Sequence, residues 1–357
     1  MRTFTCTCGN TLYFDNTQCV QCGKTLGFAP EQLKIISIDP AEQDQWHSVA
    51  NPGLLYRKCK NYQRANVCNW LIPVGDKNSF CLACRLNSMI PDLSIEENLL
   101  RWYKLEKAKR RLIYTLLTLR LPIIDFKTDA DHGLSFRFMQ DIQELDPFSD
   151  EVITYEQIMT GHHAGTITIN IIEADDSARE KIRENMNESY RTILGHFRHE
   201  IGHYYWDQLI ARSSHIDEFR SLFGDERRDY KSALTHYYKS GAQPDWQNNF
   251  ISAYASAHPW EDWAESWAHY LHFMDILETA SHHSVGIQGE EVEVTQQEFR
   301  NWIEKQNFNR IIMLLEKLMR TLNELNRSLG FRDPYPFEHS QSVIKKLEFI
   351  HKVVIET

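Results

Sequence analysis

The chain has 357 residues, enough for a sizeable core and for one main domain with a smaller companion. Its composition is that of an ordinary globular protein, with 42% hydrophobic and 25% charged residues, and no apolar run is long enough to cross a membrane. We therefore expect no membrane partner. The net charge of −10 argues against non-specific binding to polyanions, so a nucleic-acid partner is not expected either. The first residues contain no apolar segment typical of a secretory signal, and we expect a cytoplasmic protein.

The cysteines all lie before residue 85, a pattern that indicates metal sites rather than disulfides. The first set predicts a zinc ribbon over residues 1–30, formed by Cys6, Cys8, Cys19 and Cys22. The second set predicts another four-cysteine module over residues 31–95, formed by Cys59, Cys68, Cys81 and Cys84. Such sites usually supply folding energy to segments too small to make a core. The alternative is that they also form a docking surface for a protein or a nucleic acid.

The middle of the chain alternates between helical and strand patterns. Apolar residues recur at helical spacing from Ser94 to Arg120, which predicts a helix that Pro122 ends. Residues 134–139 and 165–170 alternate between apolar and polar side chains, which predicts two strands. A further helix is expected to begin near Ser177 or Ala178 and to continue past residue 203.

This further helix carries the motif His-Glu-x-x-His, with His199 and His203 one turn apart on the same face. Both imidazoles can therefore be directed at one zinc ion. Glu200 lies roughly 100° further round the helix, where it can reach a water on that zinc without binding the metal. The motif predicts a metallopeptidase in which Glu200 is the general base. The alternative is a helix that carries two histidines by chance.

A catalytic zinc with two histidines needs one more protein ligand from elsewhere in the chain. Pro259 and Trp260 are expected to begin a helix that runs towards Leu277 and carries two acids on one face. The candidates for the third ligand are Glu261, Glu265, His269 and Asp207. One of the two acids can bind zinc while the other accepts the spare N–H of a zinc-bound histidine. Alternatively, both acids only complement the helix dipole.

The C-terminal third is expected to be mainly helical. Residues 213–250 predict short helices and loops, and residues 281–294 an exposed acidic loop. Thr295 to Glu298 predicts a capping box that opens a long helix, which Gly330 ends. A last short helix follows Pro336.

The histidine motif and the paired acids together resemble the gluzincin metallopeptidases, and their lethal-factor-like branch in particular. In that branch the segment reads Glu-aromatic-aromatic-Ala-Glu, and Tyr-Ala-Ser begins seven residues before the metal-binding Glu. Here Tyr254 stands at that offset, and Asp262 departs from the pattern. The resemblance implies Glu261 as the third zinc ligand, Glu265 as the acid that braces a histidine, and Tyr254 as a donor to the oxyanion.

As a whole the chain is similar to a bacterial family described as "putative zinc-binding metallopeptidases". The similarity rests on the zinc ribbon, on residues 81–87, and on the segments 198–206 and 258–265. It implies a mostly helical α+β fold, with a zincin-like metallopeptidase domain over residues 96–357, one catalytic zinc and two structural zincs. The expected function is a zinc-dependent intracellular peptidase that acts on peptides or proteins. The alternative is a zinc-stabilised protein-interaction module whose helix zinc site is structural or idle.

Overall fold

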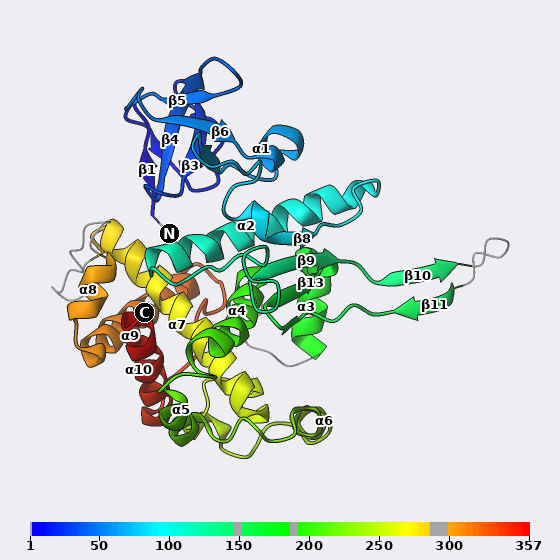
Figure 1. Cartoon of the computed structure of the whole chain (residues 1–357). Helices are drawn as coiled ribbons and strands as arrows, with labels where there is room; N and C mark the ends of the chain where they lie inside the picture. Colours follow the sequence, from blue (N-terminus) through cyan, green and yellow to red (C-terminus); the bar gives the residue numbers. More distant parts are fainter. Residues whose placement is uncertain (1, 146–151, 186–191, 286–298) are drawn as a thin grey trace. The chain divides into compact units, whose positions relative to one another are not determined.

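The computed structural model describes residues 2–145, 152–185, 192–285 and 299–357, shown in Figure 1. The chain forms two compact units: unit 1 comprises residues 1–118 and 123–181, and unit 2 comprises residues 119–122 and 182–357. Both helices and sheets are present, as the predicted α+β class requires. The predicted capping box and most of the predicted acidic loop lie outside the described residues.

Unit 1 begins with the cysteine-rich segment, which forms a two-stranded and a five-stranded antiparallel sheet. The strands are β1 (Phe4–Thr5), β2 (Thr11–Leu12), β3 (Thr25–Ala29), β4 (Lys34–Pro40), β5 (Trp46–Ser48), β6 (Leu55–Lys58) and β7 (Leu71–Pro73), and α1 is Lys60–Ala65. Ala29, Ile38, Tyr56 and Leu71 form the buried core of the larger sheet. A side chain at Gly27 would lie 2.5 Å from Leu71, so only glycine lets the strands pack this closely. The predicted boundary at residue 30 falls between β3 and β4, and the division into two cysteine modules stays a prediction.

The rest of unit 1 is a long helix and a second sheet. The helix α2 (Glu96–Thr118) confirms the prediction for residues 94–120. The sheet has the order β12-β13-β9-β8, and its strands are β8 (Asn87–Met89), β9 (Ser135–Met139), β12 (Gly161–His163) and β13 (Thr166–Asn170). Strands β9 and β13 pair in parallel and confirm the two predicted strands, with Phe136, Phe138, Ile167 and Ile169 buried. A short 3₁₀ helix, η1 (Cys84–Leu86), precedes β8, and another, η2 (Ile171–Ala174), follows β13.

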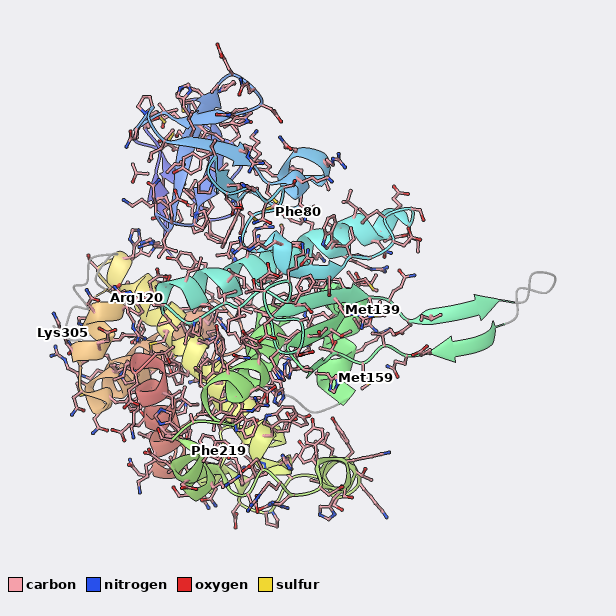
Figure 2. The ribbon with its side chains drawn as sticks, in the orientation of Figure 1. Phe80, Arg120, Met139, Met159, Phe219 and Lys305 are labelled. Atoms are coloured by element: carbon pink, nitrogen blue, oxygen red, sulfur yellow. The ribbon has the colours of Figure 1, made fainter. Side chains whose placement is uncertain are left out.

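An antiparallel ribbon of two strands, β10 (Ile142–Leu145) and β11 (Val152–Glu156), extends from this sheet. Figure 1 shows the ribbon projecting beyond β9 and β13. Met139 and Met159, labelled in Figure 2, lie where the chain leaves the sheet and where it returns to it.

The predicted start of the helix that carries His199 is wrong. Residues Asp176–Asn185 form a separate helix, α3, and the histidines lie on α4, which spans Ile193–Leu209. Thr192 has an extended backbone, and its side chain accepts a hydrogen bond from the Gly195 N–H at 2.9 Å. This N-cap satisfies a free amide of the first turn and fixes the start of α4. The spacing of apolar residues alone does not show where one helix ends and the next begins.

The remaining helices of unit 2 follow α4 along the chain, and α7 packs against it. They are α5 (Ile216–Phe223), α6 (Tyr230–Ser240), α7 (Pro259–His282), α8 (Phe299–Lys305), α9 (Phe308–Ser328) and α10 (Gln341–Ile355), with 3₁₀ turns η3 (Trp246–Asn248) and η4 (Tyr254–Ala257). The predicted helix from residue 259 is confirmed and runs on to His282. The single long helix predicted before Gly330 is wrong, because Asn307 caps a new helix by accepting the Asn309 N–H at 2.9 Å. The last helix has 15 residues rather than the few expected, and it buries Leu347 and Ile350.

Helices α4 and α7 approach each other at Gly202. A side chain there would lie 3.0 Å from Ala264 Cα, so glycine permits the close packing of the two backbones. The Trp263 indole N–H donates to the Gly202 carbonyl at 2.8 Å, and Phe219 of α5, labelled in Figure 2, packs edge-on against Trp263. This contact brings the acids at the start of α7 to the histidines of α4.

Candidate metal centre

The two histidines of α4 and Glu261 in the first turn of α7 converge in unit 2. One ligand atom from each of the three side chains lies within 4.8 Å of the others. His199 Nε2 lies 3.0 Å from Glu261 Oε2, and His203 Nε2 lies 3.6 Å from Glu261 Oε1. Ligands at the usual bond length around a tetrahedral zinc are about 3.3 Å apart, so the spacing fits this ion.

The opposite nitrogen of His199 is held by a second acid. His199 Nδ1 lies 2.6 Å from Glu265 Oε1, and the Ser252 hydroxyl donates to Glu265 Oε2 at 2.6 Å. Ser252 Oγ also accepts the N–H of Ala255, in the turn that carries Tyr254. An Nδ1–H that donates to Glu265 leaves the Nε2 lone pair of a neutral imidazole directed at Glu261.

Two lone-pair atoms that face each other need a cation between them. Glu261 Oε2 is buried and has no hydrogen-bond partner by geometry among the described residues, although His199 Nε2 is close. Burial by itself would lower the pKa of His199, but the carboxylates of Glu261 and Glu265 raise it well above its usual range. The two carboxylates thus favour a positive charge beside His199, which a metal ion bound between these atoms would supply.

The second oxygen of Glu261 is bound by a residue that the sequence did not single out. Tyr230, the first residue of α6, donates its hydroxyl to Glu261 Oε1 at 2.5 Å. Its ring packs edge-on against Trp260, whose ring in turn lies 4.2 Å from that of His203. Neither Tyr230 nor Ser252 belongs to a recognisable motif, because both reach the site only through the fold.

Glu200 and Tyr254 border the same centre. Glu200 is 8% exposed, and burial raises the pKa of its carboxyl above the ordinary value, although His199 and His203 oppose this shift. The Tyr254 ring lies 5.9 Å from that of His199. Burial raises the pKa of Tyr254 well above its usual range, so its phenol is a hydrogen-bond donor at neutral pH.

The position at which the acidic segment departs from the lethal-factor-like pattern has a structural explanation. Asp262 is fully buried and pairs with Lys346 of α10 at 2.6 Å. The same ammonium group donates to the Asn249 carbonyl at 2.6 Å. Here the lysine pairs with the buried aspartate. An aromatic residue at position 262 would leave this lysine without its carboxylate.

The other candidates for the third ligand have different partners. Glu265 binds His199 Nδ1, as described above, and His269 Nδ1 lies 2.6 Å from the Tyr335 hydroxyl. The group that forms around both histidines contains Glu261 and not Asp207.

Both cysteine sets gather as ligand groups. Each set holds its four sulfurs within 4.8 Å of one another. The sulfurs are 3.7 Å apart in the pairs Cys6–Cys22, Cys8–Cys19 and Cys68–Cys81. Sulfurs around a tetrahedral zinc are about 3.8 Å apart, whereas a disulfide bond is about 2.05 Å long. The spacing therefore fits zinc in both sets.

The two sets differ in exposure. Cys8 and Cys22 are exposed in the first set, and all four thiols of the second set are buried. Beside the second set, the buried Arg110 of α2 donates to the Val67 carbonyl, one residue before Cys68. A buried cation there offsets the excess negative charge of four thiolates around one divalent ion.

Comparison with known proteins agrees with these three groups. Residues 98–353 match a family described as "putative zinc-binding metallo-peptidase", and residues 3–95 match a zinc-ribbon domain. The chain belongs to this zinc-binding metallo-peptidase family. The resemblance predicted from the motifs is thus confirmed.

Relatives of this family member occur in mycobacteria. Uncharacterized proteins of Mycobacterium tuberculosis and Mycobacterium bovis are each 39% identical over 359 residues, which cover 100% of this chain and 96% of the relative. No solved structure matches the chain. Within the described ranges, no helix is long and apolar enough to cross a membrane.

Proposed function

We propose that this family member is a zinc-dependent peptidase that hydrolyses peptide bonds of peptides or proteins from a zincin-like core. The observation that carries the proposal is the convergence of His199, His203 and Glu261 at zinc-ligand spacing, with His199 braced from behind by Glu265. Two helices far apart in the sequence supply these groups, and a helix that carried two histidines by chance would not meet a buried carboxylate at this spacing.

The three side chains would hold one zinc ion and leave a coordination position for water and substrate. Zinc bound there supplies a water of lowered pKa and a Lewis acid for the scissile carbonyl. Glu200 would accept a proton from the attacking water as the water oxygen bonds to the carbonyl carbon. Glu200 would next give the proton to the leaving amine as the C–N bond breaks.

Tyr254 would donate a hydrogen bond to the substrate oxygen as negative charge develops on it. Glu265 does not touch substrate in this scheme. It keeps the Nδ1 proton on His199 and so presents the Nε2 lone pair to the metal.

The two cysteine groups would hold structural zinc, which gives one catalytic and two structural ions for each chain. Cysteines gathered at metal-ligand spacing fit a reducing compartment, and we place the protein in the cytoplasm. The zinc modules remain available to a protein partner.

Elemental analysis of zinc per chain tests the metal site. The wild type should hold three zinc ions, and Glu261→Ala prepared in the same way should hold about two, because one of the three ligand groups is broken. His269→Asn is the matched control, since this histidine lies on the same helix but bonds to Tyr335; it should keep all three ions. Two ions in both the wild type and Glu261→Ala would contradict the peptidase and favour the interaction module.

Glu200→Gln tests the chemistry separately from metal binding. This variant should keep its zinc and lose turnover of a mixed peptide substrate by about 10²- to 10⁴-fold, the usual contribution of a general base. Wild-type turnover by Glu200→Gln would refute the assignment of the base.

A further inference from the structure

The two oxygens of Glu261 are in different environments. Oε1 accepts a hydrogen bond from the Tyr230 hydroxyl at 2.5 Å and lies farther, 3.6 Å, from His203 Nε2. Oε2 lies 3.0 Å from His199 Nε2 and has no hydrogen-bond partner by geometry among the described residues. Glu261 is fully buried, so water cannot take the place of either partner without rearrangement.

The ring of Tyr230 is fixed on two sides although its side chain is 37% exposed. It packs edge-on against His258, with ring centres 5.2 Å apart, and edge-on against Trp260 at 5.7 Å. Both neighbours belong to the start of α7, immediately before Glu261. The first turn of α7 therefore carries Glu261 and also holds the ring of Tyr230, whose hydroxyl donates to Glu261.

His258 also ties the beginning of α6 to the beginning of α7. Its Nδ1 accepts the backbone N–H of Trp260 at 3.1 Å and caps α7. This bond leaves the proton on Nε2, which donates to the Arg228 carbonyl at 3.1 Å. Asp229, the next residue, caps α6 by accepting the Ser232 N–H at 2.6 Å. One imidazole thus sets the position of Tyr230 relative to Glu261.

We propose that Tyr230 is a positioning residue for the metal site: it occupies Oε1 of Glu261 and leaves Oε2 as the single oxygen available to zinc. The inference rests on the proposed function. A carboxylate that binds through one oxygen uses one coordination position, so the position for water stays open. Without the phenol, both oxygens of Glu261 can turn to the metal and occupy that position.

Zinc affinity of Tyr230→Phe tests this inference without any substrate. The helix-site zinc is defined as the ion that Glu261→Ala lacks, and its retention is measured by dialysis of the full chain against graded chelator. Tyr230→Phe should lose this ion at about 10- to 100-fold lower chelator activity than the wild type, the usual effect of removing a partner of a ligand. The matched control is Tyr270→Phe, which removes a buried hydroxyl from α7 that bonds to His351 at 2.9 Å, away from the metal. It should keep wild-type zinc retention.

Two further readouts separate positioning from a general loss of structure. The melting temperature of the chain with an emptied helix site is measured first in both proteins, because loss of the hydrogen bond to the buried Glu261 lowers it by itself in Tyr230→Phe. The increase in melting temperature on adding zinc, taken from each protein's own starting value, should be smaller in the variant. With Co²⁺ in the helix site and zinc in the cysteine sites, Tyr230→Phe should absorb visible light more weakly, because a second oxygen of Glu261 raises the coordination number.

The outcomes distinguish the two proposals. A wild type without helix-site zinc would overturn the proposed function and this inference with it. Helix-site zinc that is retained equally by the wild type and Tyr230→Phe, with the same Co²⁺ absorption, would overturn this inference alone and leave the peptidase in place.

Discussion

Replacing Lys346 by methionine should destabilise the protein strongly, because it leaves the buried carboxyl of Asp262 without the cation that pairs with it. The Lys346 side chain is 4% exposed, its partner Asp262 is fully buried, and the two lie 2.6 Å apart. The ammonium group also donates to the Asn249 carbonyl and lies 4.5 Å from the centre of the Phe250 ring. Lys346→Met removes all three interactions, while methionine fills most of the volume of the lysine stem.

The expected loss of unfolding free energy is about 3–5 kcal/mol, the usual cost of breaking a buried ion pair from one side. The control is Lys352→Met on the same helix, where the lysine pairs with Glu218 at 2.7 Å and both side chains are 44% exposed. Its loss should stay below about 1 kcal/mol, since solvent screens an exposed pair. The two pairs have similar lengths, so the comparison sets a buried pair, with the further contacts that burial gives its lysine, against an exposed one.

Urea unfolding at a fixed zinc concentration measures both values, with tryptophan fluorescence as the signal from the indole-rich start of α7. A double variant, Lys346→Met with Asp262→Leu, should recover most of the loss because it leaves no charge unpaired. The reasoning is refuted if Lys346→Met costs no more than Lys352→Met. It is also refuted if the double variant is as unstable as the single one.

Three further predictions concern the same unit. Ser252→Ala removes the hydroxyl that holds Glu265 Oε2, and zinc retention at the helix site should fall about 10-fold in chelator titrations. Gly202→Ala places a methyl group 3.0 Å from Ala264 Cα, so it should cost about 1–3 kcal/mol in urea unfolding and weaken zinc retention as α4 and α7 separate. Burial lowers the pKa of His351 from 6.5 to about 4, so the unfolded chain takes up a proton at this residue before the folded chain does. The free energy of unfolding therefore decreases as the pH is lowered from 6.5 to 4, by about 3 kcal/mol in total. His351→Gln should remove this part of the decrease when unfolding is measured from pH 7 to 4.

Each of these predictions has a contrary result that would settle it. Unchanged zinc retention in Ser252→Ala would show that Glu265 keeps its place without the hydroxyl. Wild-type stability of Gly202→Ala would mean that the two helices can separate at no cost. An acid slope in His351→Gln equal to that of the wild type would assign the acid sensitivity to other groups.

The sequence by itself was sufficient wherever the geometry is local. His199 and His203 share a face because the period of a helix is the same in any fold, and short spacings between cysteines hold thiols close before any tertiary contact forms. The position of Glu261 came from resemblance to a family, because residue spacing alone left four candidates open. The periods of α2, β9 and β13 were likewise visible in the order of apolar residues.

Only the tertiary structure decided which distant groups meet. Helix α4 begins at Thr192 and α9 at Asn307 because side chains cap free amides there, and apolar periodicity does not register such a bond. Gly202 lets α7 lie against α4, and that contact places an acid opposite the two histidines. Tyr230 reaches Glu261 across 31 positions of the chain by a hydroxyl at the end of an exposed helix. Contacts of this kind depend on how elements pack, and packing is a property of the whole folded chain rather than of any segment within it.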